Sequence, residues 1–417
     1  MGTNSSSQKK KHDTSQYGQL YLETDKTAYH AGETVNGKIF LNLISHYPGN
    51  QLFLRIKGKE VVHLVKNEQR GKYSQDTHYS EKKDIIKEYT LVYSWDSLLP
   101  GQFTIPFSFW LPQTLPSSFY QQGPRYLAFI VYKLEAFLKP HQADIPKMKY
   151  KQTINFKQTI TKTKNLSFTV TTPLKTWFCC KQGSNVLKAK FEKNYYSPGE
   201  NAQVSMELDN SQSQLKNLEV AFSLKQKLDV KANGRALSFN FIKVKQELPG
   251  IPQDSNQKAA SINITLPRAA TESDFHEPVA NKWDLISLKE KPYLITSNTR
   301  SSLITSEFFL EISCPMGGCY PTLPLVKLPI GILSPDFQLP AVSAPDNWEP
   351  ETLNNVALAF PSEMHQSLLY EYNNGLMNED QMSRHSKDQI NTEMAQISMP
   401  NQKFYNTEYN QNYYKKL

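Results

Sequence analysis

The first residues of the chain combine a candidate acylation site with a basic cluster. Gly2 and Ser6 in Met-Gly-Thr-Asn-Ser-Ser fit the pattern of N-myristoylation, in which the acyl chain is attached to the glycine amine. One acyl chain binds a membrane only weakly, but Lys9, Lys10 and Lys11 follow and would attract anionic lipid. The pattern predicts a two-part membrane anchor, and a flexible polar arm is the alternative.

Paired cysteines near the middle of the chain are a second candidate for lipid attachment. Cys179 and Cys180 follow two aromatic residues and precede a lysine, a setting that suits palmitoylation at a membrane surface. Buried thiols in a linker are the alternative, and we favour it. Cys314 and Cys319 lack a matching His or Cys pair for zinc. We therefore expect reduced thiols, no metal and no cofactor.

Three lysines alternate in a lysine-rich stretch, at Lys147, Lys149 and Lys151. In a strand, alternate residues lie on one face. Such a face would bind phosphate groups or an acidic segment, including the acidic tail of this chain. A solvated edge strand, on which lysines prevent aggregation, is the alternative.

Tyr414 and Leu417 in the last residues, Tyr-Lys-Lys-Leu, match a tyrosine-based sorting pattern. Such a segment adds as a strand to the sheet of an adaptor, with pockets for its Tyr and Leu side chains. The tail is rich in tyrosine, so a chance match is the alternative, and we favour it.

Patterns of catalysis are absent from the sequence. There is no Gly-x-Ser-x-Gly, no Gly-rich phosphate loop and no His-Glu-x-x-His, and the nine histidines are scattered singly. The sequence therefore predicts no enzyme and no catalytic residues. Zinc-finger spacing, RNP-type aromatic motifs and basic helices are also missing, which argues against nucleic acid as a partner.

Strand patterns fill most of the chain, and no segment has a convincing helical period. Short apolar or alternating runs separated by Gly and Pro turns extend over residues 17–172 and again over 186–337. Many short strands of this kind predict β-sandwiches. We predict an all-β chain with two tandem immunoglobulin-like β-sandwiches, joined by a linker at residues 173–185.

One turn pattern opens both blocks: Lys-x-x-Tyr-x-x-Gly-Glu occurs at residues 26–33 and again at 193–200. Glycine permits the positive φ of a reversal, and the tyrosine ring is expected in the core with its hydroxyl at the edge. The predicted structural residues are Tyr29, Gly32 and Glu33, then Tyr196, Gly199 and Glu200. The repeat indicates two copies of one architecture in series.

The two ends of the chain differ from these blocks in composition. Residues 1–16 and 338–417 are polar, so we predict a disordered arm and a largely disordered tail. Net charge is +8, but the chain from Asp346 onward contains ten acidic and five basic residues, so the tail carries −5 and the rest +13. A basic body predicts an anionic partner.

The sequence resembles the arrestins, in particular the alpha-arrestin (arrestin-domain-containing) branch. The first strand pair, the cysteine-bearing Trp-Phe-Cys-Cys segment and the start and end of the second block all contribute to the resemblance. The most specific block matches a Gly-x-Phe-x-x-Pro-Phe-x-Phe-x-Leu-Pro pattern followed by Leu-Pro-Ser-Ser-Phe. Its residues are Gly101, Phe103, Pro106, Phe107, Phe109, Leu111, Pro112, Leu115, Pro116, Ser117, Ser118 and Phe119.

The resemblance implies a non-enzymatic adaptor that binds cytoplasmic segments of membrane proteins and directs endocytosis or endosomal transport. Its implied partners are such tails and endocytic or endosomal coat proteins, and its implied location is the cytoplasm beside the plasma membrane or endosomes. The basic body adds anionic phospholipid as a further expected partner. Alpha-arrestins typically recruit ubiquitin ligases through Pro-Pro-x-Tyr, but the sequence has no Pro-Pro pair. The alternatives are a retromer-type structural coat subunit and a lipid-binding module without protein cargo.

Overall fold

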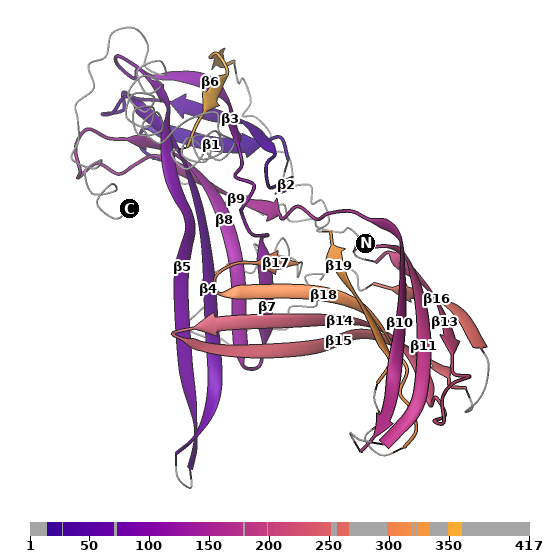
Figure 1. Cartoon of the computed structure of the whole chain (residues 1–417). Helices are drawn as coiled ribbons and strands as arrows, with labels where there is room; N and C mark the ends of the chain where they lie inside the picture. Colours follow the sequence, from indigo (N-terminus) through magenta and orange to yellow (C-terminus); the bar gives the residue numbers. More distant parts are fainter. Residues whose placement is uncertain are drawn as a thin grey trace, which may run out of the picture. The chain divides into compact units, whose positions relative to one another are not determined.

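The computed structural model describes residues 15–360, with gaps at 27, 71–72, 178–179, 198, 252–256, 267–297, 319–320, 322 and 334–348. Every regular element in these residues is a strand, and the longer strands form four sheets (Figure 1). The all-β prediction is therefore confirmed. Most of the predicted arm and most of the predicted tail lie outside the described residues.

The first sandwich contains two sheets. One sheet is antiparallel, in the order β1 (Gly18–Thr24), β3 (Thr34–Leu43) and β6 (Gly101–Trp110). The other has the order β2-β9-β8-β4-β5, with β7 also paired to β8. Its bounds are β2 (Ala28–His30), β4 (Gln51–Arg70), β5 (Tyr73–Ser94), β7 (Phe119–Gly123), β8 (Tyr126–Lys139) and β9 (Lys149–Lys157).

The second sandwich also contains two sheets. The first has the order β10 (Lys164–Thr176), β11 (Cys180–Lys193), β13 (Asn201–Asp209) and β16 (Gln257–Thr265). The second has the order β12-β19-β18-β14-β15, with β17 paired to β18. Its bounds are β12 (Tyr195–Tyr196), β14 (Glu219–Ala232), β15 (Arg235–Pro249), β17 (Thr299–Arg300), β18 (Ile304–Ser313) and β19 (Leu325–Ile332).

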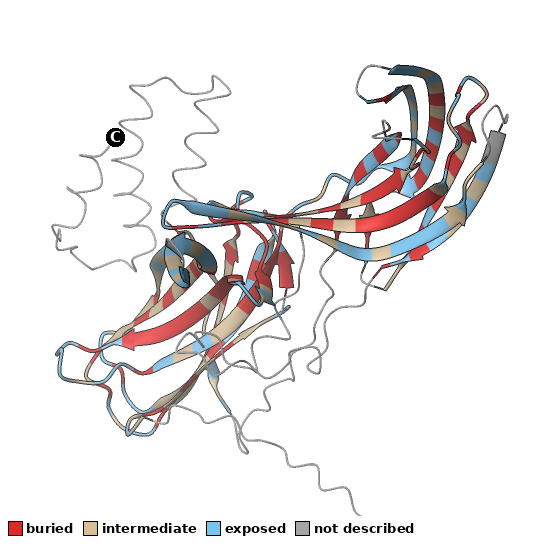
Figure 2. Cartoon of the chain, turned by 90° about the horizontal axis from the view of Figure 1, so that it is seen from below, coloured by how far each residue is buried: buried red, intermediate tan, exposed pale blue. Residues whose placement is uncertain are grey.

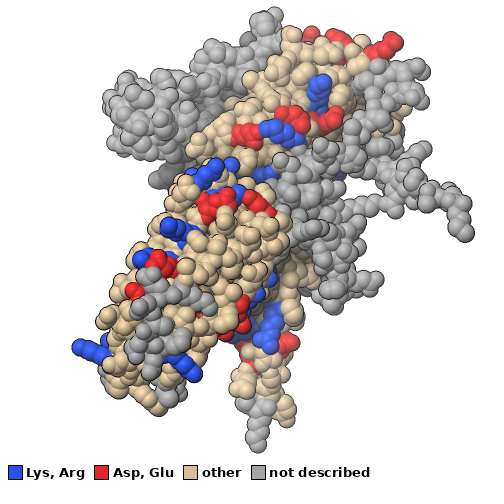
Figure 3. All heavy atoms as spheres, turned by 90° about the vertical axis from the view of Figure 1, so that its right-hand side faces the viewer, with Lys and Arg blue, Asp and Glu red and all other residues tan. Residues whose placement is uncertain are grey.

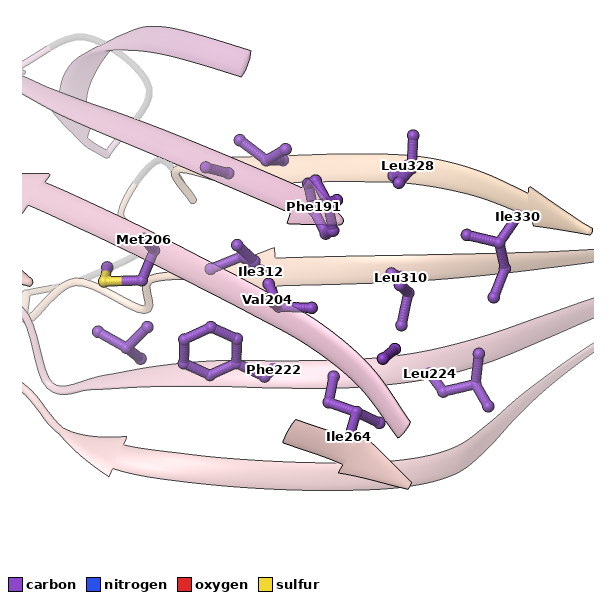
Figure 4. Packing of buried hydrophobic residues seen from close by; sticks show 14 of the residues in the cluster. Phe191, Val204, Met206, Phe222, Leu224, Ile264, Leu310, Ile312, Leu328 and Ile330 are labelled. Atoms are coloured by element: carbon purple, nitrogen blue, oxygen red, sulfur yellow. The ribbon is translucent and has the colours of Figure 1, made fainter. Parts of the chain in front are cut away.

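Alternating burial explains why these segments become strands. Buried and exposed residues follow one another along the strands (Figure 2), as expected when one face of each sheet packs on a core. In the second sandwich, Phe191 and Val204 from one sheet lie over Phe222, Leu310 and their neighbours from the other (Figure 4). Each such side chain contributes about 1.5–3 kcal/mol when fully buried, so this cluster is the main source of the sandwich's stability.

The segment predicted as a linker is mostly strand. Residues 164–176 form β10 and residues 180–193 form β11, and the two strands pair antiparallel, with Thr176 opposite Cys180. The chain reverses at Trp177, which has a φ of 52°. The difference has a physical cause, because Leu174 is 1% exposed and anchors a stretch whose Pro and Gly content is typical of loops.

Part of the tail is ordered as well. Residues 351–352 and 356–358 form β20 (Glu351–Thr352) and β21 (Val356–Leu358), which pair in parallel with β6. This contradicts the prediction of disorder for that stretch. The reason is an available sheet edge: the backbone groups of β6 accept a short strand whose Leu358 is 6% exposed.

A buried carboxylate joins the two sandwiches. Glu60 of β4 is 1% exposed and accepts hydrogen bonds from the Ser301 hydroxyl (2.6 Å), the Ser302 hydroxyl and the Leu303 N–H (3.0 Å). A buried charge is unfavourable unless it is hydrogen-bonded. These donors therefore hold the turn between β17 and β18 against β4.

Candidate functional site

The first copy of the repeated turn forms a clasp between β2 and β3. The carboxylate of Glu33 pairs with the Lys26 ammonium and accepts the His30 N–H at 2.9 Å. The Tyr29 side chain is fully buried, and Gly32 has a φ of 81°, a conformation that glycine adopts without strain. We call Lys26, Tyr29, Gly32 and Glu33 the first clasp.

The second copy makes the same contacts between β12 and β13. Glu200 pairs with the Lys193 ammonium and accepts the Ser197 N–H at 2.8 Å. Tyr196 is fully buried, and Gly199 has a φ of 79°. We call Lys193, Tyr196, Gly199 and Glu200 the second clasp. The same turn therefore closes each sandwich at the equivalent place.

Both clasp carboxylates are held in the charged form. Burial is the largest single effect on Glu33 and Glu200 and acts to raise the pKa of each. The lysine ammonium and the backbone N–H together outweigh burial, so both pKa values lie below their ordinary value of 4.5. At neutral pH each clasp is therefore an ion pair, with a structural role.

The three lysines predicted to lie on one face gather beside β8. Lys149 and Lys151 lie in β9 opposite Phe137 and Glu135. The Lys151 Nζ is 3.7 Å from the Glu135 Oε1, and the Lys147 Nζ is 5.5 Å from the centroid of the Phe137 ring. All three lysines are exposed, so this part of the sheet presents positive charge to solvent.

Lysines of three further strands extend this charge. Lys87 in β5 lies directly opposite Lys57 in β4, and Lys57 lies directly opposite Lys133 in β8. Directly opposite residues share a face, and like charges in such positions are destabilising. Arg55 lies on the same face, two residues before Lys57 in β4. Its Nε–H donates a hydrogen bond to the Glu135 carboxylate at 2.8 Å. We call this surface the cationic face: Arg55, Lys57, Lys87, Lys133, Lys149 and Lys151.

The sequence analysis did not identify the row Lys87-Lys57-Lys133. Each of these lysines stands alone in its own strand pattern. Only the register of three strands places them side by side, so no local sequence signal would have found them.

A contrasting surface lies on the second sandwich. In Figure 3, which views the right-hand side of Figure 1, basic and acidic residues lie next to one another. One such pair crosses from β11 to β13, where the Lys188 Nζ is 3.4 Å from both carboxylate oxygens of Glu207. The cationic face differs because its positive charges outnumber the Glu135 carboxylate, which pairs with Arg55 and Lys151.

The remaining predicted sites divide into two groups. Cys180 is exposed at the start of β11, so the favoured prediction of a buried thiol is wrong at this position. Cys314 is buried, and burial raises the pKa of its thiol to about 12. The others lie outside the described residues: Gly2, Lys9, Lys10, Lys11, Cys179, Tyr414 and Leu417.

The described residues contain no cluster of three or more His, Cys, Asp or Glu side chains arranged to hold a metal ion. They also contain no helix with the length and apolar character needed to cross a membrane.

Comparison with known families shows to which family the chain belongs. The family described as arrestin (or S-antigen), N-terminal domain, matches residues 18–175, and the corresponding C-terminal domain matches residues 181–337. This chain belongs to the arrestin family. The two sandwiches are accordingly its arrestin N and C domains, and the family is generally non-enzymatic.

Similar curated proteins indicate the branch. Arrestin domain-containing protein 5 of Bos taurus is 26% identical, covering 67% of this chain and 90% of the relative, and that of Homo sapiens is 23% identical, covering 69% and 89%. Arrestin domain-containing protein A of Dictyostelium discoideum is 26% identical over 46% of this chain and 34% of its own length. The relatives place this arrestin in the alpha-arrestin branch.

Proposed function

We propose that this arrestin is a non-enzymatic adaptor for membrane proteins. It binds anionic cytoplasmic segments of its cargo on the cationic face of the N domain and directs that cargo into endocytosis or endosomal transport. Family membership supports the adaptor role, and the cationic face supports the anionic character of the bound segment.

The lysine row is the observation that carries the proposal. Three like charges on adjacent strands, which lie about 4.8 Å apart, repel one another and reduce the stability of the sheet. A row maintained at the expense of stability is typical of a surface with a binding role. Carboxylates or phosphates of an extended peptide would bind along the row. Arg55 lies beside the row and is itself paired with Glu135.

Peptide binding to the full chain tests the proposal. A fluorescent acidic peptide, prepared with and without phosphoserine, is titrated with wild type and with the variant Lys57→Gln/Lys87→Gln/Lys133→Gln. We expect the variant to bind at least tenfold more weakly, because it lacks three charges that face the peptide. Wild-type affinity should fall as salt rises, since exposed charges are screened.

The matched control removes lysines from the mixed surface of the C domain. Lys188→Gln/Lys190→Gln changes two exposed lysines of β11 and should leave affinity within about twofold, after correction for net charge. Equal binding by wild type and the triple variant would remove the cationic face from the proposal.

We also propose that the N-terminal arm brings the adaptor to membranes. Gly2 would carry the acyl chain, Lys9, Lys10 and Lys11 would bind anionic lipid, and Cys179 and Cys180 are further candidates for acylation. Tyr414 and Leu417 would bind an endocytic or endosomal coat protein. Proximity labelling in cells with wild type and Gly2→Ala tests the arm, and unchanged membrane labelling in the variant would contradict it.

A further inference from the structure

Two histidines face each other across the hairpin formed by β4 and β5. His63 lies in β4 and His78 in β5, the two longest strands of the N domain (Figure 1). Their imidazole rings are stacked, with centroids 5.4 Å apart and an interplanar angle of 23°. The Nε2 of His63 is 3.4 Å from the Nδ1 of His78. Ring nitrogens are the atoms through which histidine binds metal ions, so two such ligands lie next to each other here.

The register of the hairpin fixes this arrangement. His63 is directly opposite Ser80, and Val65 is directly opposite His78, so the two histidines are diagonal neighbours on one face of the sheet. Residues 59–70 pair with β5 without a register shift, and on its other side β4 pairs with β8 at the His63 position. Because β4 is held on both sides, little conformational entropy would be lost when a ligand binds the pair.

The separation of the two nitrogens suits a bound ion better than a hydrogen bond. An N–H donor usually lies about 2.9–3.0 Å from its acceptor, so the observed 3.4 Å is long. Zinc binds an imidazole nitrogen at about 2.0–2.1 Å, and two such bonds at a tetrahedral angle place the nitrogens about 3.3–3.4 Å apart. The pair is therefore already spaced as two ligands of one tetrahedral ion.

The surroundings of the pair also favour a ligand role. His78 is exposed and His63 is half-buried. The Nδ1 of His63 is buried, which leaves Nε2, the nitrogen that faces His78, available to a ligand. Burial, and to a lesser extent repulsion from His78, lowers the pKa of His63 below its ordinary value of 6.5. At neutral pH this imidazole is therefore uncharged, as a metal ligand must be.

We propose that His63 and His78 bind a divalent transition-metal ion, with zinc as the expected ion. Imidazole suits zinc, copper and nickel, whereas calcium and magnesium prefer oxygen ligands. Asp76 and Lys82 lie on the same side of β5 as His78, so the local charge is balanced and recognition comes from the two nitrogens. Within the described residues no group of three ligand side chains occurs, so water would occupy the remaining positions of the ion.

A bound ion would link β4 to β5 through two side chains. The site is separate from the cationic face, because His63 follows Lys57 by six residues, or about 20 Å of extended strand. It therefore does not depend on the adaptor function. No metal is expected from the sequence, in which the histidines are scattered singly, because only the strand register brings these two together.

Calorimetric titration of zinc chloride into the full chain tests the site. Wild type is compared with His63→Asn and His78→Asn, in which a polar side chain remains but the imidazole is lost. We expect wild type to contain a zinc site whose affinity falls at least tenfold in each variant, because one of its two protein ligands is removed. Hydrogen exchange of β4 and β5 should slow when zinc is added to wild type, since the ion stabilises the state it binds, and should not change in either variant.

His46→Asn is the matched control, because His46 is also exposed but lies between β3 and β4, outside the hairpin. Its zinc affinity should stay within about twofold of wild type. His78 is exposed, so its replacement leaves the core intact, and thermal unfolding without metal verifies the fold of His63→Asn. The proposal is overturned if zinc binds both hairpin variants as tightly as wild type, if only one of the two replacements weakens binding, or if His46→Asn weakens it equally.

Discussion

The two clasps have the same backbone design but differ in how the tyrosine hydroxyl and the lysine are used. In the first clasp the Tyr29 hydroxyl donates to the Asp25 carboxylate and accepts the Lys26 N–H at 2.9 Å. In the second, the Tyr196 hydroxyl donates to the Lys193 carbonyl at 2.7 Å. The first clasp therefore binds its tyrosine to a charged group, and the second to a neutral one.

The clasp lysines differ in exposure, and here the second clasp has the contact that is better shielded from water. The Lys26 side chain is 52% exposed, whereas that of Lys193 is 15% exposed and lies 5.3 Å from the centroid of the Tyr196 ring. Ion pairs gain strength when they are shielded from water. The two domains therefore stabilise the same turn differently. The N domain uses a hydrogen bond from the Tyr29 hydroxyl to a carboxylate, and the C domain uses an ion pair whose lysine is shielded from water.

Removing a clasp tyrosine should have the largest effect. Tyr29→Ala and Tyr196→Ala each delete a fully buried ring, and each should lower the free energy of unfolding by about 3–5 kcal/mol. Urea titration with hydrogen exchange of β3 and β13 would locate the loss in the N or the C domain. A loss below about 1 kcal/mol in one variant would show that its tyrosine is not part of the core.

Removing only the tyrosine hydroxyl should lower stability by different amounts in the two clasps. Tyr29→Phe leaves the Asp25 carboxylate without this donor and should destabilise by about 1.5–3 kcal/mol, the range for bonds to charged groups. Tyr196→Phe should lose about 0.5–1.5 kcal/mol, because its acceptor is neutral. Thermal unfolding of both variants checks the order, and a larger loss from Tyr196→Phe would reverse the proposed difference.

The lysine substitutions should show the reverse order. Lys26→Met removes an exposed ion pair and should lower the free energy of unfolding by about 0.2–1 kcal/mol. Lys193→Met should lower the free energy of unfolding by more than Lys26→Met does, but by less than the roughly 3 kcal/mol expected when a fully buried pair is broken. Chemical denaturation in low and high salt is the measurement. Equal losses in both variants, with equal salt dependence, would argue that shielding does not distinguish the pairs.

The smallest expected effect is on pH dependence. The pKa values of Glu33 and Glu200 are lowered on folding, so their stabilisation is present above the ordinary value of 4.5 and is lost as pH falls through the folded pKa. Hydrogen bonding to Glu200 raises the pKa of Lys193, so its stabilisation is present below 10.5 and is lost as pH rises through the folded pKa.

Unfolding free energy measured from acid to alkaline pH tests these signs. Glu33→Gln and Glu200→Gln should each flatten the acid limb, and Lys193→Met should flatten the alkaline limb as well. An acid limb unchanged by both glutamine variants would show that the clasp carboxylates do not titrate with folding.

Residues close together in the sequence were the ones whose structure followed from sequence patterns. The spacing of Tyr, Gly and Glu predicted a turn with a buried tyrosine ring at both places. It did not predict the ion pairs of Lys26 with Glu33 and of Lys193 with Glu200. The predicted linker at residues 173–185 is mostly strand, although its composition is typical of a loop. Its strands are stabilised by pairing and by burial of Leu174, and composition alone contains neither.

The cationic face shows more clearly what sequence patterns do not predict. Lys149 and Lys151 were predicted to share a face because they alternate in one strand. Lys57, Lys87 and Lys133 meet only because β5, β4 and β8 pair in one register. A shift of a single residue would move an entire strand's side chains to the opposite face, so the row depends on register set by the whole domain.

By itself the sequence determined the all-strand character of this arrestin, its division into two related units and the position of the repeated turn in each, because alternation and turn chemistry act over a few residues. The tertiary structure alone decided the lysine row and the strand that residues 356–358 add to β6. Each of these joins residues far apart in the chain, and only packing of the complete sheets brings them together.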